Sequence, residues 1–203
     1  MSGKVQLNSL LFKIAGMGAF FSLGFFLAGL FISSFNEDFG EFLIVSSPTL
    51  PLLPMVLAFH QLHHSRFPYW SHAVRAIGII GGASVLIACI LGLLNPAHFS
   101  ASAGAFVLSM IGCIGVWLLL NGLLSLQARV IPRFLAMLGI AVGIAWLIGI
   151  GSTILNLFNS LLVKSLMGFL GVNILALVVG YLLWTIWTGY WFLTSRVSNA
   201  SDF

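Results

Sequence analysis

Four of the five histidines lie close together in the sequence, and imidazole is a side chain that readily holds a metal ion. They are His60, His63, His64 and His72. His60 and His64 are four residues apart, which places them on one face of a helix. His72 could approach them across the intervening stretch HHSRFPYWSH. These four histidines are therefore the candidate metal ligands.

The same histidines also have a simpler interpretation, as neutral headgroup contacts at a membrane surface. No cysteine or carboxylate lies near them in the sequence to complete a metal site. A haem would need two axial histidines at matching depth on facing helices, and His98 falls on the opposite side of the predicted membrane. We therefore predict no cofactor and keep a metal or haem as the alternative. On this interpretation, His63→Ala leaves expression and assembly near normal.

The composition indicates which elements carry these residues. Of the 203 residues, 60% are apolar and 6% are charged, whereas an ordinary soluble domain has roughly half and a quarter. So little polar surface excludes a soluble domain, a disordered segment and a nucleic-acid-binding protein. A membrane-spanning helix needs about 20 mostly apolar residues, so the chain has room for about six or seven spans.

Charged and loop-forming residues divide the chain into six apolar runs of a single transmembrane domain, residues 1–203. The predicted spans are residues 10–33, 42–62, 73–94, 103–126, 134–157 and 166–194, with loops at 63–72 and 97–102. In the second run, a regular helix is expected from about Ser47, with a kink near Pro54. The predicted fold class is all-α, a polytopic transmembrane bundle of six helices.

The cations predict the orientation of this bundle. With the N-terminus in the cytoplasm, seven of the eight Lys and Arg residues fall inside and only Lys164 falls outside, beside the acidic Glu37, Asp38 and Glu41. The seven are Lys4, Lys13, Arg66, Arg75, Arg129, Arg133 and Arg196. Because basic loops stay on the cytoplasmic side, both termini are predicted to be cytoplasmic, in a multi-pass protein of the inner (plasma) membrane.

Neutral polar and aromatic residues in the later spans form a second candidate site. Asn121 and Asn173 are costly to leave unpaired in hydrocarbon, so both are expected to face inward and to hydrogen-bond across helices. Trp184 and Trp187 are typical of the aromatic belt at a membrane surface. The alternative is that these four residues bind a ligand, in a pocket between the fourth and sixth spans.

Glycine recurs at a spacing that lets helices approach closely. Gly78 and Gly82, and likewise Gly139 and Gly143, are four residues apart within one span. This spacing leaves internal packing and self-association both open. The expected partners are the lipid bilayer and, through Gly-rich helix faces, a second copy of the chain or a larger membrane complex. No nucleic-acid partner is expected.

Three stretches carry a resemblance to a known group of proteins. They are LFKIAGMGAFFSLGFFLAGLF, GVWLLLNGLLSLQARVIPRFLAMLGIAVGI and YLLWTIWTGYWFL. With these stretches the chain resembles a group of bacterial six-span integral membrane proteins classed as domains of unknown function. The resemblance implies a six-span fold. It assigns no catalytic residues, because none are established for that group.

The predicted spans lack the groups that membrane chemistry usually needs. None has a carboxylate or a centrally placed cation, which ion-coupled transporters and pumps use, and the chain has no HExxH metalloprotease motif. We therefore predict no catalytic residues, and an accessory or scaffolding subunit or a self-associating bundle. The alternative is a transporter or binder of a small apolar ligand, such as a lipid or quinone, with a neutral pocket near the second, fourth and sixth spans.

Overall fold

A computed structural model describes residues 9–36, 39–40, 43, 47, 49–94, 96–158 and 179–194. All regular elements in these ranges are helices, so the all-α prediction is confirmed for this part of the chain. The helices are α1 (Ser9–Ile32), α3 (Thr49–His64), α4 (Pro68–Leu94), α5 (Pro96–Ala128) and α6 (Arg133–Phe158). Residues 179–194 are also helical and are called the C-terminal helix below.

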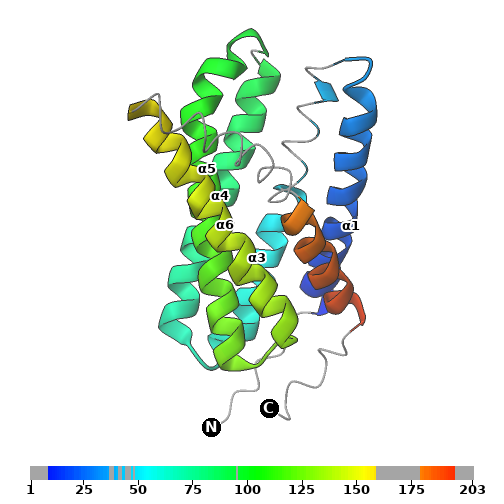
Figure 1. Cartoon of the computed structure of the whole chain (residues 1–203). Coiled ribbons are helices and arrows are strands. Elements are labelled where there is room, and N and C mark those ends of the chain that lie inside the picture. Colours follow the sequence, from blue (N-terminus) through cyan, green and yellow to red (C-terminus); the bar gives the residue numbers. More distant parts are fainter. Residues whose placement is uncertain are drawn as a thin grey trace.

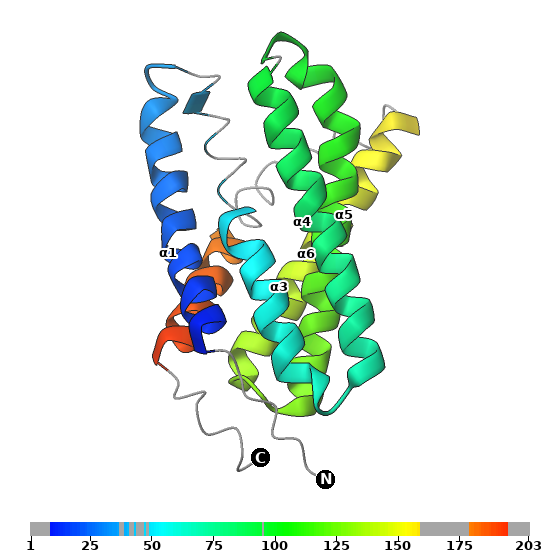
Figure 2. The same ribbon diagram turned by 180° about the vertical axis from the view of Figure 1, so that it is seen from behind.

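Helices α4, α5 and α6 pack side by side, and α3 packs against α4 and α5 (Figures 1 and 2). Helix α1 contacts α3 and also contacts the C-terminal helix. There, Gly16 lies so close to the C-terminal helix that a Cβ atom would come within 2.8 Å of the Gly189 carbonyl oxygen. Helix α3 and the C-terminal helix therefore join α1 to the rest of the bundle.

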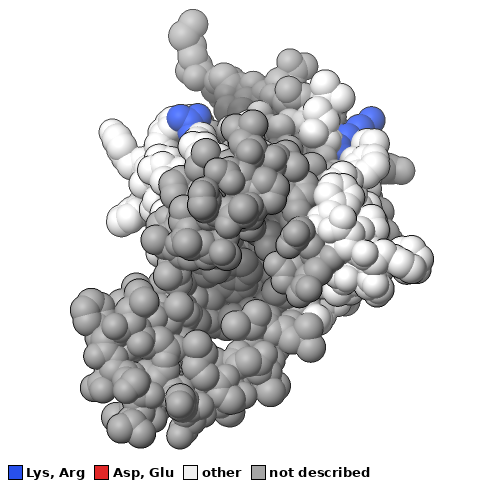
Figure 3. Space-filling view, turned by 90° about the horizontal axis from the view of Figure 1, so that it is seen from above, with Lys and Arg blue, Asp and Glu red and all other residues white. Residues whose placement is uncertain are grey.

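The start of α1, the α3–α4 turn, the α5–α6 turn and the end of the C-terminal helix all lie at the lower end in Figure 1. Every Lys and Arg that the structure describes is at this end, on a turn or within eight residues of a helix terminus. They are Lys13, Arg66, Arg75, Arg129 and Arg133. We call it the basic end. Viewed from the opposite end, the described surface is mostly uncharged, with Lys and Arg only at its margins (Figure 3).

Two predicted loops are wrong in extent. Helix α4 begins at Pro68 and already includes His72, so three residues, 65–67, connect it to α3. Helix α5 begins at Pro96, so residues 97–102 are helical. In both places a proline begins the helix, where its fixed φ and missing N–H fit the first turn. Of the predicted span 166–194, only residues 179–194 are described.

The second predicted run contains a regular helix that begins two residues later than expected. Helix α3 begins at Thr49, close to the expected start at Ser47, and Pro54 lies inside it. At its far end, α3 is tied to α5, because the guanidinium of Arg66 donates a hydrogen bond to the carbonyl oxygen of Ala128. Arg129 then adopts a left-handed conformation, with a φ of 54°, that ends α5.

One helix in the described part of the chain is long and apolar enough to cross a membrane. It is α1, over the 23 residues Leu10–Ile32. Shorter apolar helical stretches are Gly112–Ala128 and Arg133–Ile148. This finding supports association with a membrane by length and composition.

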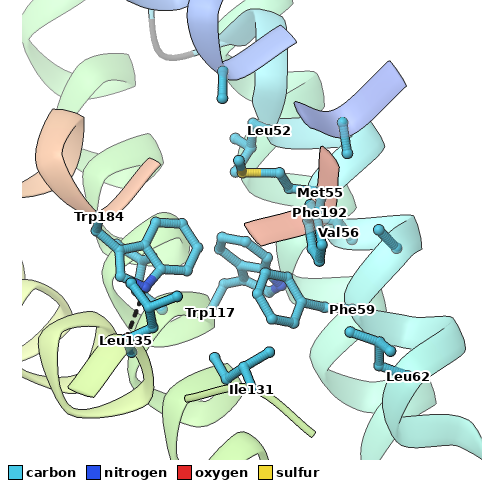
Figure 4. Packing of buried hydrophobic residues seen from close by; sticks show 14 of the residues in the cluster. Leu52, Met55, Val56, Phe59, Leu62, Trp117, Ile131, Leu135, Trp184 and Phe192 are labelled. Carbon is cyan, nitrogen blue, oxygen red and sulfur yellow. Dashed lines mark hydrogen bonds between the residues drawn. The ribbon is translucent and has the colours of Figure 1, made fainter. Parts of the chain in front are cut away.

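The core lies where α3, α5, α6 and the C-terminal helix meet (Figure 4). At its centre are three aromatic side chains, Phe59, Trp117 and Trp184, each from a different helix and each almost completely buried. Their ring centroids are 5.9 to 6.1 Å apart, a spacing typical of favourable aromatic pairs. We call these three residues the aromatic core.

Candidate functional site

The α3–α4 hairpin brings three of the four candidate histidines together. His60 and His64 lie one turn apart near the end of α3, and the short connection folds α4 back so that His72 lies beside them. The ring centroids are 5.1 Å apart for His60 and His64, 4.8 Å for His60 and His72, and 5.0 Å for His64 and His72. Their potential ligand nitrogens all lie within 4.8 Å of one another. We call these residues the three-histidine cluster.

Ser71 fixes the position of His60. The hydroxyl of Ser71 donates a hydrogen bond of 3.0 Å to the backbone carbonyl oxygen of His60, and Nδ1 of His60 lies 2.6 Å from the same hydroxyl oxygen. A serine hydroxyl has one proton, and here the carbonyl oxygen accepts it. Nδ1 of His60 therefore donates to Ser71, and Nε2 of His60 carries a free lone pair.

His63 lies apart from the cluster, in the core. Its Nε2 is 3.0 Å from the hydroxyl oxygen of Ser125 on α5, and its ring stacks on Phe59 with centroids 5.9 Å apart. Only 1% of its surface is exposed. His63 is thus buried, hydrogen-bonded and stacked on a neighbouring ring, as residues that pack the core usually are. It therefore has a structural role that the neighbouring histidines do not share.

The burial of His63 reverses the expectation that its replacement is harmless. His63→Ala is expected to lower the free energy of unfolding by about 2–3 kcal/mol, because it leaves a cavity beside Phe59 and an unpaired hydroxyl on Ser125. The measurement is the apparent melting temperature in detergent. His72→Ala is the control, since His72 is exposed, and equal melting temperatures for the two variants would contradict this role.

The surroundings of the three-histidine cluster determine what it could bind. His60 and His64 are half-buried and His72 is exposed, so the cluster is open at the basic end. The positive charge of Arg75 acts electrostatically on His60, and no Asp or Glu is among the described residues. The cluster thus offers three imidazole nitrogens and, among the described residues, no carboxylate ligand.

The two candidate tryptophans occupy different environments. Trp184 is 1% exposed, and its Nε1 donates a hydrogen bond of 3.1 Å to the carbonyl oxygen of Leu135 (Figure 4). Trp187 is 53% exposed and contacts Phe134, with ring centroids 5.4 Å apart. Trp184 is therefore a core residue whose N–H already has an acceptor, whereas Trp187 lies on the outer surface near the basic end.

Asn121 faces inward as expected but makes no hydrogen bond across the helices to any described residue. It is 1% exposed, and neither its Nδ2 nor its Oδ1 has a hydrogen-bond partner in the part of the chain that the structure describes. The Nε1 atom of Trp117, one turn earlier on α5, is also buried and has no partner among the described residues. Burying an unpaired amide costs about 1–3 kcal/mol, so the buried amide of Asn121 lowers the stability of the folded chain. Asn173, the other candidate asparagine, lies outside the described residues.

From the sequence, Asn121 was expected to face inward, but the two other buried residues of the same α5 face, Trp117 and Ser125, were missed. Trp117, Asn121 and Ser125 are spaced four residues apart and are all buried. Trp117 belongs to the aromatic core, and Ser125 is the partner of His63. The spacing itself was the signal that could have found them, because residues four apart share one face of a helix.

The paired glycines are used for packing within the chain. A Cβ atom on Gly78 would lie 2.5 Å from Val56, and one on Gly82 would lie 2.8 Å from Leu53. One on Gly139 would lie 2.8 Å from Nε1 of Trp184. One on Gly143 would lie 2.6 Å from the backbone nitrogen of Leu119. Helices within the chain therefore already cover the faces on which these glycines lie.

No protein-family model, curated protein or solved structure matches the chain.

Proposed function

We propose that this chain is a multi-pass integral membrane protein of the inner (plasma) membrane, with both termini in the cytoplasm. It has no catalytic residues of its own and serves as an accessory or scaffolding subunit of a membrane assembly. The observation that carries this proposal is α1, an apolar helix whose outer face remains uncovered.

The outer face of α1 is apolar along nearly its whole length. Its exposed large side chains are Leu10, Ile14, Met17, Phe20, Phe21, Phe25, Leu27, Leu30 and Phe31. In water, each Å² of such surface is unfavourable by about 25 cal/mol, and soluble monomers rarely expose patches larger than a few hundred Å². Lipid chains solvate the same side chains without that cost, so a bilayer is the environment that suits α1.

The lengths of the other helices favour a bundle that crosses the membrane several times. Helices α4, α5 and α6 have 27, 33 and 26 residues. At 1.5 Å per residue they are roughly 40, 50 and 39 Å long, against a hydrocarbon core of about 30 Å. The gathering of Lys and Arg at the basic end favours a cytoplasmic location for that end.

The orientation is tested with two serine-to-cysteine variants in a background where Cys89 and Cys113 are replaced by serine. Ser65, on the α3–α4 turn, is at the basic end, and Ser34, just after α1, is at the other end; both are exposed. A membrane-impermeant maleimide is expected to label Ser34→Cys in intact cells and Ser65→Cys only after the membrane is opened. Labelling of both from the same side would contradict the proposal.

The accessory role is tested by what remains bound after extraction in mild detergent. Native mass spectrometry is expected to find the chain in a complex with other subunits or a second copy. Because the paired glycines are covered internally, such a partner would contact the exposed apolar face of α1. At Gly24 on α1 no atom of the described residues lies within 4 Å of the position a Cβ would take. A monomer throughout would contradict the accessory role.

Asn121 favours a second candidate function, a transporter or binder of a small lipid- or quinone-like ligand, because its buried amide has no partner among the described residues. Asn121→Leu separates the two functions. If Asn121 has no ligand, removing an unpaired buried amide is expected to raise the free energy of unfolding by about 1–3 kcal/mol. A melting temperature that instead falls, together with the loss of a co-purifying small molecule, would support the binder.

A further inference from the structure

We infer that His60, His64 and His72 bind one divalent first-row transition-metal ion at the basic end of the molecule. This site goes beyond the proposed function, which needs no metal. Two observations carry the inference: the convergence of the three ligand nitrogens and the hydrogen bond between His60 and Ser71.

The geometry needs only a small closure to become a metal site. The ligand nitrogens lie within 4.8 Å of one another. Metal–nitrogen bonds of 2.0–2.1 Å in tetrahedral geometry require nitrogens roughly 3.3 Å apart. The site must therefore contract by about 1.5 Å at most. His72 is exposed and His64 is half-buried, so rotation of these two rings can provide the contraction.

The hydrogen bond to Ser71 leaves one ring nitrogen of His60 free for coordination. Because its Nδ1 donates to Ser71, its Nε2 is the nitrogen with a lone pair. Ligating histidines usually donate their other N–H to a protein acceptor, which fixes the tautomer and the ring orientation. Ser71 has this position here, as a positioning residue that would not itself touch the metal.

The donor set indicates the class of metal. Imidazole nitrogens suit zinc, copper, nickel and iron, whereas magnesium, calcium and manganese prefer oxygen ligands. Three protein nitrogens leave a fourth position for water or another small ligand, as in zinc sites that are open to solvent. The positive charge of Arg75 acting on His60 opposes the metal itself and favours an anion in that fourth position.

The experiment is a titration of the full chain in detergent with Zn²⁺ against a chelating dye, with Co²⁺ as the spectroscopic probe. The wild type is expected to bind one Zn²⁺ per chain and to give the visible absorption of four-coordinate Co²⁺. His72→Ala is expected to weaken Zn²⁺ binding at least tenfold. Because His72 is exposed, this variant should keep the wild-type melting temperature.

His98→Ala is the matched control. His98 lies in the first turn of α5. Ser125, the partner of His63 beside the three-histidine cluster, is 27 residues further along the same helix, or about 40 Å away. This variant is expected to bind Zn²⁺ as the wild type does. Ser71→Ala is expected to weaken binding roughly 10- to 100-fold and to change the Co²⁺ spectrum, and Ser71→Thr, which keeps the hydroxyl, is expected to restore both.

Three results would overturn the site. They are a wild type that binds no Zn²⁺ or Co²⁺, a His98→Ala variant that loses as much affinity as His72→Ala, and a His72→Ala variant that keeps full affinity. None of these results changes the labelling expected for Ser34→Cys and Ser65→Cys. The metal site and the membrane orientation are therefore tested independently.

Discussion

Replacing Gly143 with alanine is expected to separate α5 from α6 and to lower the free energy of unfolding by about 3 kcal/mol. The added Cβ atom would lie 2.6 Å from the backbone nitrogen of Leu119 and 2.8 Å from the carbonyl oxygen of Gly115. Overpacking in a core typically costs about 1–3 kcal/mol. The upper end of that range applies because both neighbours are helix backbone, which cannot rotate aside as a side chain can.

Gly24→Ala is the matched control, because in the described part of the chain nothing lies within 4 Å of the position that its Cβ would take. This variant is expected to keep the wild-type stability. The measurement is the apparent melting temperature of each variant in the same detergent, read from the fraction that remains monodisperse after heating. If both variants melt at the wild-type temperature, α5 and α6 do not approach each other at Gly143 as closely as described.

Trp184→Ala is the second change with a large expected effect, a loss of about 3–5 kcal/mol in the free energy of unfolding. The truncation empties the centre of the aromatic core, where Trp184 contacts Phe59 and Trp117. It also removes the hydrogen bond to the carbonyl oxygen of Leu135. Trp184→Phe is expected to recover part of the loss, since it refills most of the volume without the N–H donor.

Trp187→Ala is the matched control, because it makes the same truncation three residues further along the same helix. Because Trp187 is exposed and contacts only Phe134 among the ring contacts described, its truncation is expected to cost less than about 1 kcal/mol. Melting temperatures in detergent give the comparison. An equal loss for the two tryptophan variants would mean that Trp184 is not the core residue.

The sequence could predict the three-histidine cluster but not the separate position of His63. The spacing of His60 and His64 is enough to place them on one helix face, and a short hairpin brings His72 to them. His63 has the same residue type and the same neighbourhood in the sequence. It nevertheless lies in the core, where it pairs with Ser125, 62 positions away in the sequence. That contact depends on how α3 packs against α5, which the spacing of the histidines does not show.

The same limit applies to the fold. Apolar runs predicted that the described elements are helices, since apolar residues in such numbers need the hydrogen bonding of a helix. Polar residues at 63–72 and 97–102 indicated loops, but Pro68 and Pro96 begin helices there. Trp184 and Trp187 looked alike in composition. Their different environments follow from the rotation of the C-terminal helix against α6, which composition does not determine.

The two buried indoles give this protein an optical signature of its own. Trp117 and Trp184 stand almost perpendicular, at 85°, with centroids 5.9 Å apart. Chromophores so close and so fixed couple their electronic transitions, which gives a strong circular dichroism signal in the ultraviolet region where tryptophan absorbs. Because each indole comes from a different helix, that signal vanishes when the helices separate, even while every helix remains intact.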